Sequence, residues 1–401
     1  MRKIYLFTFM MLLLVHLKGQ AQQITLHVER AGTLHGMINA SRLPYITDLK
    51  LTGELNGTDI SFIRTLVKKN LRFLDLSEAR IVEGGAIYYS NYRTSNDIIG
   101  SYMFYNPDYS PISPCAISKI NLPNSVTGIE EGAFKSCTRL TDINIPNSVT
   151  SIGGGAFSGC TSLTDINIPN SVTSIERGAF SGCTSLTDIN IPNSVTSIGE
   201  RAFSGCTSLT DINIPDAVKS IEPETFSGCT RLTDINIPNS VTSIGYEAFY
   251  NCTRLTDINI PNSVTSIERS TFYSCTSLTD INIPNSVTSI GEQAFYNCDN
   301  LKSVYMNAST PPFIGSQAFH NISKDLTIYI PRGSYTAYWL SYWGNYNLVE
   351  YDPTDIQGVT TSAHNGVEKY FSIDGRPLPG PCKGVNIIQD TDGKTRKAWI
   401  P

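Results

Sequence analysis

The sequence predicts an α/β repeat solenoid, a right-handed coil of short parallel strands that is capped at both ends and followed by a small C-terminal β module. Residues 117–300 form eight consecutive units of 23 residues without an insertion, and a fixed period of roughly 20–50 residues is typical of stacked repeats. In each unit, apolar residues at offsets 3 and 5 from its first residue flank one outward position, which is the period of a strand. A proline at offset 6 then ends the strand, because it has no N–H for a ladder.

Residues 1–21 have the order of a signal peptide. Arg2 and Lys3 precede an apolar run from Ile4 to Leu17, and small residues end at Ala21. The run is shorter than the roughly 20 residues that cross a bilayer as a helix. We therefore expect an exported protein that is located at the cell surface, in the medium or in the periplasm, and we expect no transmembrane segment.

Residues 22–97 are expected to cap the N-terminal end of the coil with degenerate repeats. The strand spacing occurs in residues 46–51 and again in residues 71–76. Between them, Thr58 or Asp59 is in position to cap a helix. The apolar side of that helix would carry Ile60, Ile63, Leu66 and Val67.

The solenoid and its C-terminal cap are expected over residues 98–351. Residues 99–104 match half a repeat, residues 301–325 form a repeat lengthened by two residues, and residues 326–331 make a final strand. We expect five aromatic residues at helical spacing to cover the end of the core: Tyr335, Tyr338, Trp339, Tyr342 and Trp343. Residues 352–366 are predicted to be a linker.

Residues 367–401 are predicted to form a small module of short strands. Asp374-Gly375 and Asp392-Gly393 are typical turn sequences between such strands.

Composition and charge argue against several classes of function. The formal net charge is −5, and residues 1–21 hold three basic and no acidic residues, so their removal makes the charge more negative. Such a protein does not suit nucleic acid or an anionic membrane. His27, His35, His320 and His364 lie outside the uniform repeats, and the chain has no nucleophile elbow, zinc-binding helix motif or phosphate loop. We expect no enzyme, no cofactor and no metal site.

Eight cysteines recur at offset 20 of the repeats: Cys137, Cys160, Cys183, Cys206, Cys229, Cys252, Cys275 and Cys298. Exported proteins usually pair their cysteines. However, equivalent residues on adjacent coils lie about 4.8 Å apart with parallel Cα–Cβ bonds, whereas a disulfide needs converging Cβ atoms about 3.8 Å apart. We predict buried, unpaired thiols. Cys115 and Cys382 are out of phase with this array, and their pairing stays open.

Two outward positions of the strand carry a binding hypothesis. Offset 2 is Lys119 in the first repeat and aspartate in the next seven: Asp142, Asp165, Asp188, Asp211, Asp234, Asp257 and Asp280. Offset 4 is asparagine in all eight: Asn121, Asn144, Asn167, Asn190, Asn213, Asn236, Asn259 and Asn282. In this topology both rows face the concave side of the coil.

Two interpretations of the aspartate row stay open. Carboxylates about 4.8 Å apart repel each other by roughly 0.9 kcal/mol before salt screens them, and a row that tolerates this repulsion invites a basic partner or bound cations. The simpler interpretation, which the sequence favours, is that tandem duplication copied one tolerated residue. Glutamate and glycine alternate at offset 13 from Glu130 to Gly291, so the copied unit was two repeats long.

Offsets 14 and 15 vary along the array, as in Arg177-Gly178 and Glu200-Arg201. If recognition needs distinct side chains, this variable edge offers them. Whether the edge or the concave face binds stays open.

The consensus L-T-D-I-N-I-P-N-S-V-T-S-I-x-x-x-A-F-x-x-C-T-S closely resembles the BspA-like leucine-rich repeat, a family of secreted and surface bacterial proteins. The strict match covers residues 117–300, and residues 49–100 and 328–350 look like that family's usual flanks. The resemblance implies a curved solenoid that binds proteins, with several members associated with adhesion, and it implies no catalytic residues. Residues 370–388 look similar to tail segments of secreted proteins in the same bacteria, some of which direct sorting to the surface.

The repeats and the resemblance together predict an exported leucine-rich repeat protein that binds an extracellular protein or glycan, in adhesion to host or neighbouring cells. The alternative is a passive spacer of the cell envelope without a specific ligand. The identity of the ligand and the oligomeric state are left open.

Overall fold

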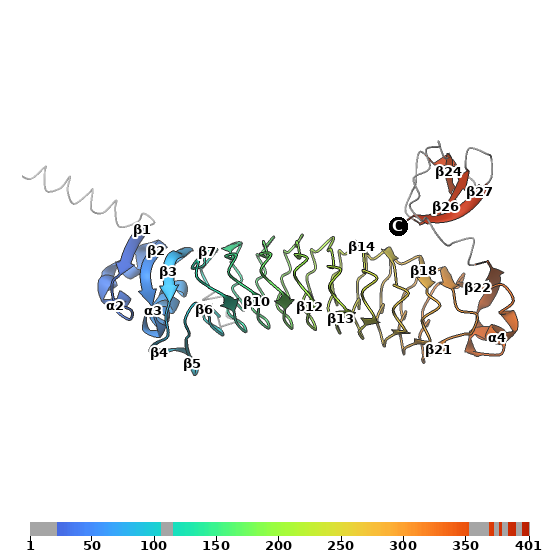
Figure 1. Ribbon diagram of the computed structural model, residues 1–401, viewed down its shortest axis with the longest axis horizontal. Coiled ribbons are helices and arrows are strands. Elements are labelled where there is room, and N and C mark those ends of the chain that lie inside the picture. The colour runs from blue at the N-terminus through green and yellow to red at the C-terminus, as the bar shows by residue number, and fades with distance from the viewer. Residues whose placement is uncertain are drawn as a thin grey trace, which may run out of the picture.

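The computed structural model describes residues 22–105 and 115–352, together with the backbone of four strands between residues 369 and 400. Residues 22–352 form an extended stack of coils with a cap at each end (Figure 1). The predicted signal peptide, nearly all of the predicted linker, the turns at residues 374–375 and 392–393, and Cys382 lie outside the described residues.

The N-terminal cap is a parallel sheet that continues directly into the solenoid. Its strands β1 (Gln22–Val28), β2 (Ile46–Leu55) and β3 (Phe73–Ile81) pair side by side, and β3 pairs with β7 (Lys119–Asn121) of the first repeat. The strand spacing predicted β2 and β3. The sequence analysis did not predict β1, although its Ile24, Leu26 and Val28 alternate with polar residues. The smaller elements of the cap are α2 (Leu34–Met37), the 3-10 helix η1 (Ala40–Tyr45), and the hairpin of β4 (Gly84–Tyr89) and β5 (Tyr92–Thr94).

Helix α3 (Gly57–Val67) packs the predicted apolar side against this sheet, but its N-cap differs from the prediction. Asn56, rather than Thr58 or Asp59, caps the helix and accepts a hydrogen bond from the Thr58 amide at 3.0 Å. Asp59 lies three residues later, and its carboxylate accepts from the Asn56 amide at 3.0 Å, which completes a capping box. The same buried carboxylate accepts from the Leu34 amide at 3.0 Å, so it is also a tertiary contact.

Two parallel ladders run along the solenoid. The first uses offsets 2–5, and its strands are β7, β9 (Asp142–Asn144), β14 (Asp234–Ile235), β16 (Asp257–Ile258), β18 (Asp280–Ile283), β20 (Ser303–Met306), β22 (Thr327–Pro331) and β23 (Asn347–Tyr351). In the middle repeats this ladder shrinks to the bridges Asn167↔Asn190 and Asn213↔Asn236. Proline at offset 6 removes one donor there, and the amide of Thr233 lies 3.4 Å from the carbonyl of Thr210.

The second ladder, which the sequence analysis did not predict, uses offsets 11 and 12. Its strands are β6 (Ile98–Ile99), β8 (Gly128–Ile129), β10 (Ser151–Ile152), β11 (Ser174–Ile175), β12 (Ser197–Ile198), β13 (Ser220–Ile221), β15 (Ser243–Ile244), β17 (Ser266–Ile267), β19 (Ser289–Ile290) and β21 (Phe313–Ile314). Each is only two residues long, too short for a periodic signal. Among the described residues the helices lie in the caps, so the repeats themselves consist of ladders and turns.

A continuous stack of phenylalanine rings forms the centre of the core. It runs from Phe104 of the half repeat to Phe319, with neighbouring ring centroids 5.0–5.8 Å apart and nearly parallel planes. Phe203, in the middle, is fully buried between Phe180 and Phe226. Each phenylalanine ring is therefore covered on one face by the preceding coil and on the other face by the following coil.

The cysteine prediction is confirmed. All eight array cysteines are buried and free, as is Cys115. Each array thiol donates to the carbonyl of a phenylalanine on the preceding coil, for example Cys183 to Phe157 with 3.2 Å between sulfur and oxygen. Burial raises the pKa of Cys183, Cys252 and Cys298 to about 12. The thiols thus stay protonated and hold adjacent coils together.

Coils approach most closely at offset 13, where glycine and glutamate alternate. A Cβ atom on Gly199 would lie 2.5 Å from the amide nitrogen of Arg177, and one on Gly245 would lie 2.6 Å from the nitrogen of Pro223. Because both contacts are with backbone, no side chain fits at these positions. Glycine in alternate coils is a packing requirement.

The C-terminal cap consists of β22, α4 (Tyr335–Trp339), the 3-10 helix η2 (Tyr342–Asn345) and β23. Tyr338 and Trp343 are fully buried, and the Trp343 indole N–H donates to the Pro312 carbonyl at 2.9 Å. The capping prediction is correct for these two rings. It is wrong for Tyr335, Trp339 and Tyr342, which are exposed because the α4 turn presents only one side to the core.

The predicted C-terminal β module is confirmed at the level of its strands. They are β24 (Lys369–Ser372), β25 (Pro377–Leu378), β26 (Gly384–Gln389) and β27 (Thr395–Ile400), and they pair in the antiparallel order β25-β24-β26-β27.

Replacing Phe203 by alanine is expected to lower the free energy of unfolding by about 3–5 kcal/mol, because it opens a cavity that two neighbouring rings cannot fill. The thermal transition should shift to lower temperature or broaden. The exposed Tyr246→Ala is the control and should melt like the parent. A melt of Phe203→Ala that matches the parent would contradict the ring stack as the core.

The array thiols are expected to be inert to an aromatic disulfide reagent at pH 8 in the native protein and to react fully in guanidinium chloride. Their folded pKa lies above the ordinary value of 9.0, so the unfolded chain loses these protons first as the pH rises. The contribution of the thiols to stability should therefore be constant below about pH 9 and be lost towards pH 12. Rapid native reaction, or pairwise oxidation found by mass spectrometry, would contradict the buried array.

Candidate functional site

The first ladder displays the predicted aspartates and asparagines on one outward face, which we call the Asp/Asn face. Asp142, Asp165, Asp188 and Asp211 are exposed, whereas Asp234, Asp257 and Asp280 are half-buried. All asparagines from Asn144 to Asn259 are exposed, and Asn121 and Asn282 are half-buried. Adjacent coils pair identical residues, because Asp234 pairs with Asp257 and Asn121 with Asn144. The structure thus brings all the predicted site residues onto a single surface.

Each end of the Asp/Asn face has a different chemical boundary. At the first repeat, Lys119 forms an ion pair with Asp142 at 2.6 Å and also lies over the Phe73 ring. At the other end the asparagine row continues into Tyr305 and Tyr329, whose rings stack 4.6 Å apart. Between these ends the face offers hydrogen-bond acceptors and negative charge in regular rows, which suits a ligand with spaced cations.

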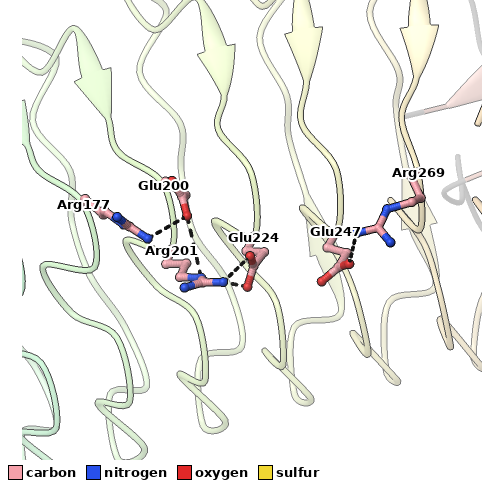
Figure 2. A network of polar contacts seen from close by, with 6 residues as sticks. All are labelled: Arg177, Glu200, Arg201, Glu224, Glu247 and Arg269. Carbon is pink, nitrogen blue, oxygen red and sulfur yellow. Dashed lines mark hydrogen bonds and ion pairs between the residues drawn. The ribbon is translucent and has the colours of Figure 1, made fainter.

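The variable edge contains lateral ion pairs that the sequence analysis missed. Figure 2 shows Arg177 and Arg201 converging on Glu200, and Arg201 reaching on to Glu224. Arg201 donates two hydrogen bonds to the Glu224 carboxylate, at 2.8 and 2.5 Å. A 23-residue separation between opposite charges was the available signal, because like offsets become neighbours in the stack.

A second ion pair on this edge joins Arg269 and Glu247 at 3.0 Å (Figure 2). Arg269 also lies over the exposed ring of Tyr246. These pairs are half-exposed, so each contributes little to stability. They fix the directions of the edge side chains.

Offset 15 is left-handed in every coil, with φ between +53° and +61°. Its residues are Tyr102, Gly132, Gly155, Gly178, Arg201, Glu224, Glu247, Ser270, Gln293 and Gln317. Glycine adopts this conformation freely, but other residues lose about 1–2 kcal/mol each. Only three coils use glycine, so the other coils keep a side chain at a position where it is conformationally unfavourable. Residues other than glycine in such unfavourable backbone conformations are typical of functional surfaces.

The described residues were also surveyed for metal sites and membrane spans. They contain no group of three His, Cys, Asp or Glu side chains that could hold a metal ion. No helix among them has both the length and the apolar character that a membrane crossing requires.

Comparisons with known proteins agree with this architecture. A family model described as the BspA type leucine-rich repeat region matches residues 97–233 and 197–327, in six copies. A comparison with curated protein sequences finds no match. Among solved structures, a leucine-rich repeat protein from Bacteroides ovatus is 28% identical, with a TM-score of 0.54 over 70% of this chain and 69% of that chain.

Two further solved structures are similar in sequence over shorter or more divergent stretches. The leucine-rich repeat protein of T. pallidum is 35% identical over 41% of this chain and 73% of its own, with a TM-score of 0.37. A leucine-rich cell surface protein from Faecalibacterium prausnitzii is 26% identical over 64% of this chain and 88% of its own, with a TM-score of 0.31.

The left-handed residues at offset 15 predict that two substitutions change the free energy of unfolding in opposite directions. Gln293→Gly should raise the free energy of unfolding by about 1 kcal/mol, because it relieves an unfavourable conformation. Gly178→Ala should lower it by about 1 kcal/mol, since a Cβ there meets only Ser181 Cβ at 3.8 Å and the change is confined to the backbone. Urea denaturation measures both, and equal effects of the same sign would contradict the conformational cost.

Proposed function

Because the chain belongs to the BspA-type leucine-rich repeat family, whose model matches more than half of its length, we propose that it is an exported bacterial surface protein that binds an extracellular protein or glycan through its Asp/Asn face. The family is one of bacterial surface-type repeat proteins, and its solenoids suit protein binding rather than catalysis. Adhesion to host or neighbouring cells is the role that we assign to this binding.

The single observation that carries the proposal is the alignment of seven carboxylates on one exposed face. A regular row of negative charge recruits a partner with a basic surface, because complementary potentials raise the association rate and exclude acidic competitors. The neighbouring row of asparagines provides amide donors and acceptors that suit polar groups of either a protein or a glycan. The face is long, so many weak contacts can act together.

Export and placement are parts of the same proposal. Residues 1–21 have the composition of a cleaved leader. We propose that residues 22–97 and the C-terminal cap within residues 98–351 close the ends of the solenoid, that residues 352–366 are a linker, and that residues 367–401 direct sorting to the surface. The ordered strands of that last segment support an independent module.

The second candidate function is a passive spacer of the cell envelope. The observation that favours it is the uniformity of the repeats, since duplication alone would produce identical aspartates without selection for a ligand. In that case the stack would only hold another element away from the membrane.

Binding of the full chain to a panel of purified extracellular matrix proteins, measured by biolayer interferometry, tests the Asp/Asn face. The triple variant Asp165→Asn, Asp188→Asn, Asp211→Asn is expected to weaken capture about tenfold at low salt, because three attractive charges are lost.

The matched control is Glu222→Gln, Glu268→Gln, Glu292→Gln, which removes the same charge at offsets 13 and 14, away from the Asp/Asn face. It should leave capture unchanged. Equal loss in both variants would indicate non-specific attraction. Capture of nothing in the panel by the parent chain, together with surface exposure on intact cells, would favour the spacer.

A further inference from the structure

A groove of about 530 Å³ lies on the variable edge, in the N-terminal half of the stack. It follows the left-handed row from Tyr102, across the glycines at 132, 155 and 178, to Arg201. The two large residues form its ends and the three glycines form its floor. The groove shares no residue with the Asp/Asn face. Its size is within the range of roughly 300–1,000 Å³ that ligand sites occupy.

The Tyr102 end of the groove is rigidly held. The buried Arg64 side chain donates to the carbonyls of Tyr102 at 2.8 Å and Met103 at 2.6 Å, which fixes the backbone that follows the ring. The Tyr102 hydroxyl donates to Glu131 at 2.7 Å. The ring lies against Gly132, where a Cβ atom would come within 2.5 Å of it. An aromatic wall is therefore present before any ligand arrives.

The floor is open at Gly155 and Gly178 because side chains are missing there, although packing leaves room for them. A Cβ atom on Gly155 would meet only Ser158 Cβ at 3.7 Å, and one on Gly178 only Ser181 Cβ at 3.8 Å. Arg201, Ser270 and Gln293 show that larger residues adopt the same conformation in other coils. Glycine at these two positions keeps the groove empty.

The groove offers side chains rather than backbone to a ligand. The amides of Gly132, Gly155 and Gly178 already donate to the next coil, at 2.8–2.9 Å. An extended peptide could not add to this edge as a strand, because the amides that it would pair with are used. Serine hydroxyls at 158 and 181 line the floor instead, with both donor and acceptor capacity.

Lys135 is the lining cation that remains for an anionic group, because Arg177 is paired with Glu200 and Arg201 with Glu224. Lys135, Arg177 and Arg201 are basic, and Glu131 and Glu176 are acidic. Glu131 already accepts the Tyr102 hydroxyl. Lys135 has no ion-pair partner among the described residues. The mixture of a cation, hydroxyls and one aromatic ring matches a molecule that has many hydroxyl groups, apolar ring edges and at least one negative charge.

We propose that this groove binds an acidic oligosaccharide, a glycan segment whose sugar units carry carboxylate or sulfate groups. Tyr102 packs against a sugar ring, the serines and Glu176 hydrogen-bond its hydroxyls, and Lys135 receives the anionic group. The protein then has two recognition surfaces of opposite preference, since the Asp/Asn face suits a cationic partner.

Isothermal titration of the full chain with tetragalacturonic acid, a heparin tetrasaccharide and neutral maltotetraose tests this proposal. At least one of the two acidic probes should bind, and maltotetraose should bind at least tenfold more weakly. The double variant Gly155→Gln, Gly178→Gln fills the groove and should lose at least tenfold in affinity. Lys135→Gln should lose affinity for the acidic probe and reduce its salt dependence.

Glu247→Gln is the matched control, because it places the same side chain at the same offset outside the groove, and it should bind like the parent. Thermal melts identify any variant that fails to fold. Binding that survives the filled groove, absence of binding to both acidic probes, or groove-dependent binding of a polyglutamate peptide in place of the sugars would each overturn the proposal. The Asp165, Asp188 and Asp211 variant should bind the sugars normally, which separates this site from the Asp/Asn face.

Discussion

The structure depends on one constraint, which is that consecutive coils stay in register so that each residue lies on its equivalent in the preceding coil. Ser174 pairs with Ser197 and Asp234 with Asp257, each after 23 residues. The phenylalanine stack, the thiol-to-carbonyl hydrogen bonds and the charged rows all follow from this register. Near Pro311 the chain carries one extra residue rather than the expected two, because Ile290 pairs with Ile314 and Val304 with Ile328, each after 24 residues. The turn absorbs this residue and the stack continues.

Much of the fold could be predicted from the sequence because the register turns a linear period into neighbours in space. The unpaired cysteines are a clear case, since parallel Cα–Cβ bonds at a fixed spacing rule out a disulfide without any knowledge of the surroundings. The outward direction of Asp165 and Asn167 likewise follows from the strand period. For these residues a local pattern and a single repeat distance are sufficient.

Other features depend on contacts that a pattern does not specify. Asn56 caps α3 and Asp59 completes the capping box, while the same Asp59 carboxylate accepts from Leu34, a residue 25 positions earlier. Tyr338 is buried whereas its neighbour Trp339 is exposed, since a single helical turn presents one side to the core. The groove could not be predicted because its shape comes from missing side chains at a left-handed position, and the sequence displays only a few glycines among many.

Alternation at offset 13 has a consequence for how the gene can change in length. A coil with glycine fits closely on a coil with glutamate, and the array contains both interfaces in strict succession from Glu130 to Gly291. Unequal recombination that removes a single glutamate coil would bring two glycine coils together, a junction that already exists where Gly291 lies beside Gly315. Loss of a single glycine coil would bring two glutamate coils together, a junction found nowhere in the array. The solenoid is therefore expected to change in length by whole pairs of coils or by loss of a glutamate coil, whereas loss of a single glycine coil is disfavoured.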